Sequence, residues 1–223
     1  MEDIMKISDD SKVYSNPENL LSLLFPFLGE IKPVERFSIK KKRFLYIKRK
    51  AFDNILNTIN EFKYEKGYMD CFIYGTIKYE KSHILATIVC FLFRTGKRVV
   101  YLPDCRKLVQ DPEYYIKSAL FLIYTNNSAK ISEIHSCVML DEIEEFCKEK
   151  SEPLYIVVDQ INALDRFLGQ ITTKHYYIKS SSANNISALH LKLKQTNEKK
   201  IELYEGFNKW IKIIPILPSM NDE

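Results

Sequence analysis

Glycine, tryptophan and long apolar runs are scarce in this sequence. It has six glycines and one tryptophan among 223 residues, and because glycine usually makes up about 7% of a protein, fibrous and glycine-rich classes are excluded. No apolar stretch reaches the roughly 18 residues of a membrane-spanning helix, and the N-terminus lacks the basic and apolar regions of a signal peptide. We therefore expect an intracellular protein of the cytoplasm or nucleus, with no membrane partner.

Paired cysteines are also lacking. The five cysteines are odd in number, far apart and free of any C-x-x-C pair, and the four histidines are dispersed. This distribution argues against a disulfide framework and against a structural zinc site. The net charge of +4 and the 28% charged residues are ordinary, so neither a disordered chain nor a polycation fits, and we expect one principal domain.

The first 60 residues predict a helical and basic extension. The segment Ser15-Asn-Pro-Glu18 has the spacing of a capping box, which predicts a short helix through Phe25. Residues 38–50 contain seven basic and no acidic residues. Such a segment fits phosphate or nucleic-acid binding or a nuclear address, and it fits equally a basic strand and helix start with solvated lysines. Apolar residues at helical spacing then predict a helix from Phe52 to Phe62.

After Gly67 short apolar runs alternate with longer amphipathic stretches. This pattern is typical of successive βα units and predicts a parallel sheet in a domain over residues 61–223. We expect strands at 71–74, 98–102, 154–158 and 175–179, and helices at 81–93, 111–124 and 136–149.

A phosphate-binding pattern lies between the first of these strands and its helix. The P-loop motif GxxxxGK(S/T) is matched by Gly75, Lys81 and Ser82, whereas Glu80 stands where the second glycine belongs. In such a loop backbone N–H groups surround a phosphate, the lysine reaches the β- and γ-phosphates and the hydroxyl binds Mg²⁺. The expected binding segment comprises Gly75, Thr76, Ile77, Lys78, Tyr79, Glu80, Lys81, Ser82 and, on the first helical turn, His83. For His83 a packing role is the alternative.

A second pattern supports the first. The apolar run Leu154-Tyr-Ile-Val-Val158 ends in Asp159, as a Walker B strand does to place a carboxylate beside Mg²⁺. Gln160 follows, where many ATPases have a glutamate that polarises the attacking water. We therefore expect Ser82 and Asp159 to bind Mg²⁺, and Asp159 and Gln160 to serve any catalysis. Asp104 and Arg106 follow another strand, where a ligand role and a turn with a salt bridge are both open.

Three ordered blocks, residues 74–86, 96–106 and 156–164, resemble the P-loop NTPase module of Crinkler-type effectors, a likeness that extends over roughly residues 50–205. The resemblance implies a three-layer P-loop fold with an additional strand, here residues 175–179, between the P-loop and Walker B strands. It also implies ATP as ligand, Mg²⁺ as cofactor, and Ser181 or Asn184 as a sensor of the γ-phosphate. Crinkler proteins usually carry a translocation header and an effector domain, so we expect this chain to lack the lid and the effector module and to work with a separate effector domain or protein partner.

Because Glu80 opposes phosphate binding, two functional hypotheses remain open. A non-glycine residue in a left-handed loop position costs about 1–3 kcal/mol, and a carboxylate near a phosphate adds about 3 kcal/mol of repulsion at an effective dielectric constant of about 20. The leading hypothesis is an ATP-Mg binding domain with weak or no hydrolysis. The alternative is a non-catalytic pseudo-NTPase scaffold that binds protein or nucleic acid through residues 38–50.

Overall fold

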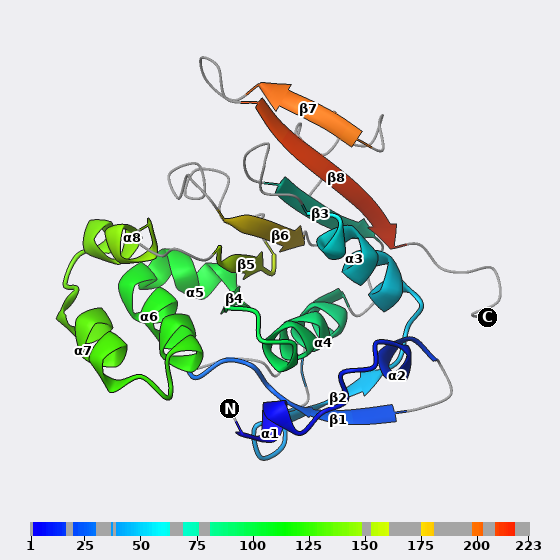
Figure 1. Ribbon diagram of the computed structural model, residues 1–223, viewed down its shortest axis with the longest axis horizontal. Helices are drawn as coiled ribbons and strands as arrows, with labels where there is room; N and C mark the ends of the chain where they lie inside the picture. Colours follow the sequence, from blue (N-terminus) through cyan, green and yellow to red (C-terminus); the bar gives the residue numbers. More distant parts are fainter. Residues whose placement is uncertain are drawn as a thin grey trace.

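Figure 1 shows the computed structural model of the chain. It describes residues 2–16, 20–29, 37, 39–62, 69–75, 81–148, 153–160, 175–180, 198–202 and 208–216. Within these residues no helix combines the length and the apolar character needed to cross a bilayer.

A sheet of six strands forms the centre of the fold, in the order β4-β5-β6-β3-β8-β7. The first five are β4 (Val99–Leu102), β5 (Tyr155–Val158), β6 (Tyr176–Ser180), β3 (Met69–Gly75) and β8 (Asn208–Ile216), and each neighbouring pair among them is parallel. β7 (Glu198–Glu202) pairs antiparallel with β8 at the edge. The expected α/β class with a parallel sheet is confirmed, and β6 lies between β3 and β5 as expected. The sequence analysis did not predict β7 and β8.

Four helices gather at the β4 edge of the sheet (Figure 1). They are α5 (Cys105–Gln110), α6 (Pro112–Ile123), α7 (Ser128–Ser136) and α8 (Leu140–Lys148). α6 follows the expectation because the Asp111 carboxylate accepts the Tyr114 N–H at 3.1 Å and Pro112 occupies the first turn. The helix expected over 136–149 begins only at Leu140, and α5 and α7 were not predicted.

Helix α4 (Lys81–Arg94) is enclosed on both sides. Residues 84–93 are all buried, because the sheet covers one side of the helix and the N-terminal part of the chain covers the other (Figure 1). That part consists of α1 (Glu2–Met5), α2 (Lys12–Ser15), β1 (Leu20–Leu24), β2 (Arg43–Ile47) and α3 (Ala51–Asn60). Its buried side chains belong to the same apolar cluster as those of the sheet.

The helix predicted from Ser15 to Phe25 is wrong. The structure has α2 before this segment and then β1, which pairs antiparallel with β2 so that Leu23 faces Phe44. A five-residue run of four leucines and a serine has no period that separates helix from strand. The decisive hydrogen bonds come from β2, about twenty residues further along the chain, and the sequence pattern does not reveal that pairing.

The basic segment contains a strained turn. The backbone N–H and C=O groups of Lys40 and Arg43 bond each other at 3.0 Å, and Lys41 and Lys42 between them have φ values of 52° and 61°. Two positive φ values in a two-residue hairpin loop are typical of a type I′ turn, for which Asn-Gly is preferred. The expected strand and helix start are present, because β2 ends at Ile47 and α3 begins at Ala51, but Lys48 between them is buried and not solvated as expected.

Replacing the turn by its preferred residues should stabilise the protein. We expect the double variant Lys41→Asn/Lys42→Gly to raise the free energy of unfolding by about 1 kcal/mol, since it relieves two left-handed non-glycine residues. Urea denaturation measures this gain. The matched variant Lys41→Ala/Lys42→Ala keeps the strain, so an equal gain in both variants would show that charge repulsion, not backbone strain, destabilises the turn.

Candidate functional site

The site is formed at the edge where the parallel strands end. β3 ends at Gly75, β5 at Val158 and β6 at Ser180, and α4 begins at Lys81. Carboxyl ends of parallel strands meet at one edge of a sheet, which is where ligands bind in open α/β folds. The structure therefore brings the end of the expected Walker B strand and the start of the expected P-loop helix to the same edge.

Asp159 is fixed in a buried position. Only 1% of the residue is exposed, its N–H donates to the Leu102 carbonyl at 3.0 Å and its carbonyl accepts from Cys105 Sγ at 3.0 Å. Its carboxylate oxygen Oδ1 accepts a hydrogen bond from Ser180 Oγ. Strand β6 thus orients the carboxylate that follows strand β5.

Lys81 stands within electrostatic range of this carboxylate. Burial lowers the pKa of the Lys81 ammonium group below its usual range, and the charge of Asp159 acts in the opposite direction. A half-buried cation at the start of a 14-residue helix adds to the positive end of the helix dipole. The arrangement therefore combines a site for anions with a carboxylate beside it.

Gln160 has an unusual backbone conformation. Its φ is 59°, in the left-handed region that a residue with a long side chain rarely adopts. The Gln160 N–H points at Ser180 Oγ at 3.4 Å. Ser180 therefore contacts both residues expected to serve catalysis, and the strained backbone lies where strain often accompanies function.

Ser180 is the residue that the sequence analysis missed. The expected sensors Ser181 and Asn184 lie outside the described residues, whereas Ser180 is the last residue of β6 and is fully buried. The signal was present, because Ser180 begins the polar cluster after the strand. The expected strand ended one residue earlier, which placed Ser180 outside it.

The remaining predicted positions divide into two groups. Thr76, Ile77, Lys78, Tyr79 and Glu80 lie outside the described residues. Ser82 is half-buried in the first turn of α4. The His83 ring lies 4.5 Å from the Phe37 ring and 6.0 Å from the Phe44 ring, between centroids, so it contacts the N-terminal part of the chain. A ligand contact by His83 stays a prediction.

Asp104 and Arg106 form the turn and salt bridge that were one of the two alternatives. Arg106 Nη2 lies 3.1 Å from Asp104 Oδ2, and Asp104 Oδ1 accepts the Arg106 N–H at 3.0 Å as the N-cap of α5. Tyr115 Oη accepts the Asp104 N–H at 2.8 Å. Burial raises the pKa of the Tyr115 hydroxyl, and the nearby carboxylates of Asp104 and Asp159 act in the same direction. This hydroxyl therefore keeps its proton and supports the edge of the site.

The oxygen atoms at this site suit a cation that is bound partly by the protein and partly by a ligand. Among the described residues no three His, Cys, Asp or Glu side chains come close enough to hold a metal ion by themselves. Mg²⁺ commonly takes one or two protein oxygens and completes its shell with phosphate and water. The Ser82 hydroxyl and the oriented Asp159 carboxylate fit that demand.

No protein-family model matches this sequence, and no curated protein is significantly similar to it.

The hydrogen bond between Ser180 and Asp159 should be measurable in the absence of any ligand. We expect Ser180→Ala to lower the free energy of unfolding by about 1.5–3 kcal/mol, because a buried carboxylate loses a donor. In the background of Asp159→Asn the same substitution should cost much less, since the charge is gone. Additive effects in this double-mutant cycle would contradict the coupling of the two side chains.

Proposed function

We propose that this chain binds a nucleoside triphosphate, ATP with Mg²⁺, at the carboxyl edge of its sheet and hydrolyses it weakly or not at all. The observation that supports this most is the placement of Lys81 and Asp159 at the same edge of the sheet, Lys81 at the start of α4 and the buried Asp159 directly after β5, so that the charge of Asp159 acts on the Lys81 ammonium group. Lys81 carries a cation in a place where burial weakens its charged form. A polyanionic ligand would stabilise that charge.

Each residue has a defined part in this proposal. The backbone N–H groups of residues 75–80 would surround the phosphates, and Lys81 would contact the β- and γ-phosphate oxygens. The Ser82 hydroxyl and the Asp159 carboxylate would hold Mg²⁺, and Ser180 keeps that carboxylate in place. Bound Mg²⁺ would neutralise part of the phosphate charge. Gln160 and Ser181 would sense the γ-phosphate.

The proposal includes a three-layer P-loop fold of the additional-strand type. The order of β3, β6, β5 and β4 supports it, because β6 separates the strand before the phosphate loop from the strand before Asp159. Membership in the Crinkler-type effector family, with a separate effector domain as partner, belongs to the same proposal.

Calorimetric titration with ATP-Mg tests the binding. We expect Lys81→Ala to abolish detectable binding, and we expect the matched variant Lys97→Ala, beyond the far end of α4, to bind as the wild type does. Glu80→Gly should tighten binding at least about tenfold, because it removes a carboxylate and any left-handed strain at once. Equal affinities of Lys81→Ala and the wild type would refute the proposed site.

Hydrolysis should be slow even where ATP binds. Gln160 orients water but is a poor base, and Glu80 opposes phosphate binding, so two electrostatic contributions to catalysis are weakened. We expect steady-state phosphate release far below about 1 s⁻¹, the lower end of common turnover numbers. Release near that rate that disappears in Lys81→Ala would show an active ATPase instead.

A second candidate is the non-catalytic scaffold. The exposed lysines of the strained hairpin turn favour it, since they present positive charge at a backbone cost. In that case ATP-Mg would not bind, and residues 38–50 would contact a protein or a nucleic acid.

A further inference from the structure

The antiparallel pair of β1 and β2 has an exposed apolar face, and a basic turn directly precedes β2. Leu20, Leu45 and Ile47 are 58%, 54% and 42% exposed, and Leu20 faces Ile47 across the two strands, so their side chains form one patch. Lys41 and Lys42 are exposed at the turn before Arg43, at the end of the strand pair opposite to Leu20 and Ile47. We call these five residues the basic ribbon.

The strained turn of the basic ribbon indicates that the positive charges of Lys41 and Lys42 have a function other than forming the turn. Lys41 and Lys42 hold left-handed conformations that glycine and asparagine adopt at lower cost. Backbone strain of this kind persists where the side chains serve a purpose other than forming the turn. The two ammonium groups at one end of the strand pair and the apolar patch along its exposed face therefore point to a partner surface that is both apolar and acidic.

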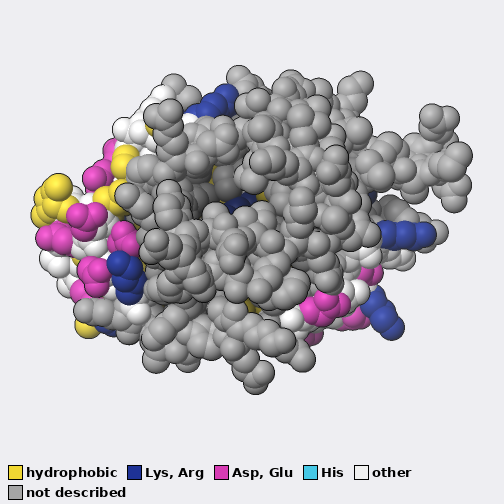
Figure 2. All heavy atoms as spheres, turned by 90° about the horizontal axis from the view of Figure 1, so that it is seen from above, with side chains coloured by type: hydrophobic (Ala, Val, Ile, Leu, Met, Phe, Trp, Pro, Cys, Tyr) yellow, Lys and Arg dark blue, Asp and Glu magenta, His cyan; other side chains and the backbone are white. Residues whose placement is uncertain are grey.

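Such a surface lies at the end of the molecule formed by α7 and α8. Figure 2 shows hydrophobic side chains gathered among Asp and Glu side chains at this end. Val138 and Met139, between the two helices, are 74% and 61% exposed. They are held outward because the Glu142 carboxylate accepts both of their backbone N–H groups, with 3.1 Å to Met139 N, and these bonds lower the pKa of Glu142.

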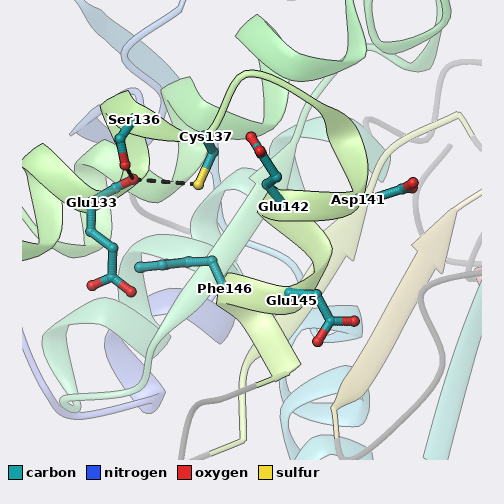
Figure 3. Close-up of a pocket in the computed structure, with 7 residues that line it drawn as sticks. All are labelled: Glu133, Ser136, Cys137, Asp141, Glu142, Glu145 and Phe146. Carbon is teal, nitrogen blue, oxygen red and sulfur yellow. Dashed lines mark hydrogen bonds between the residues drawn. The ribbon is translucent and has the colours of Figure 1, made fainter.

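A groove lies between α7 and α8 (Figure 3), with lining residues on both sides of Val138 and Met139 in the sequence. It has a volume of about 350 Å³, and its lining residues come from both helices: Glu133, Ser136, Cys137, Asp141, Glu142, Glu145 and Phe146. Helices α7 and α8 together contain five carboxylates and only two ammonium groups, those of Lys130 and Lys148. Their net charge is therefore negative. We call the groove with Val138 and Met139 the acidic end.

We propose that the acidic end of one molecule docks the basic ribbon of a second copy of this chain. The charges are opposite, and each surface offers exposed aliphatic side chains that the other can cover. The two surfaces belong to different parts of the fold (Figure 1), so a molecule that docks one partner through its ribbon keeps its own acidic end available. The contact is therefore heterologous and allows further copies to add head to tail.

The side chains of the ribbon favour a protein surface over a nucleic acid. Single-stranded nucleic acids are bound by basic residues together with aromatic rings on which bases stack. The exposed apolar residues of the ribbon are leucine and isoleucine, which offer no ring. An acidic surface that carries Val138 and Met139 matches them in both charge and character.

Sedimentation velocity of the full chain across the micromolar range, at low salt, tests the proposal. We expect self-association that weakens as salt is added. Lys41→Glu/Lys42→Glu and Asp141→Lys/Glu145→Lys should each weaken it by roughly tenfold or more. The variant Lys6→Glu/Lys97→Glu changes the net charge by the same amount as the first and should associate like the wild type. Lys41→Asn/Lys42→Gly should also associate less although its fold is more stable, which separates lost docking from lost structure.

Mixing the two charge-reversed variants gives the sharpest result. The first retains the native acidic end and the second the native ribbon, and the two reversed surfaces are again opposite in charge, so the mixture can form the contact in both ways. We expect heterocomplexes in the mixture at concentrations where neither variant associates alone. A wild type that stays monomeric, association unchanged in both variants, or a mixture without heterocomplexes would overturn the proposal. So would ribbon variants that lose oligonucleotide binding while their sedimentation is unchanged.

Discussion

The burial of helix α4 on both sides is the constraint on which the rest of the structure depends. Ten consecutive residues of this helix are buried, and a helix that is apolar all round cannot remain at a surface. The sheet covers one side, and α1, α2, α3 and the β1–β2 hairpin cover the other. Arg94 Nε donates to the Ile7 carbonyl at 2.9 Å and Cys90 Sγ donates to the Leu24 carbonyl at 3.3 Å. The N-terminal part of the chain is therefore a layer of the fold.

The same helix explains the character of the candidate site. Because α4 is held on both sides, its first residue, Lys81, is kept partly away from water next to Asp159, and burial disfavours its charge. On the opposite side of the pair, Ser180 holds the carboxylate and receives the Gln160 N–H. Strands β5 and β6 thus fix the negative charge of Asp159, and the packing of α4 fixes the positive charge of Lys81. In the proposed function, the fixed cation would face the phosphates and the fixed carboxylate would face Mg²⁺.

Sequence patterns predicted the elements that are marked locally by an apolar run or by a helix cap. Strands β3 to β6 and helices α4 and α6 follow from apolar runs and from the cap at Asp111. The places of Lys81 at the start of a helix and of Asp159 directly after a strand also followed, because strand, loop and helix occur in a fixed order. The patterns failed where structure depends on distant partners. β1 is a strand because β2 pairs with it. The role of Ser180 could be recognised only from the structure, which places the end of β6 beside Asp159.

The contact of His83 with Phe37 and Phe44 has a mechanical consequence. Phe44 lies in the hairpin that carries the basic ribbon, and His83 is two residues from Lys81 within the same helical turn. The ribbon and Lys81 are therefore joined by one aromatic stack and one turn of helix. If docking shifts the hairpin against α4, the affinity for a ligand at Lys81 changes, and the ligand changes docking by the same free energy. Assembly and ligand binding would then act on each other as a reciprocal allosteric pair.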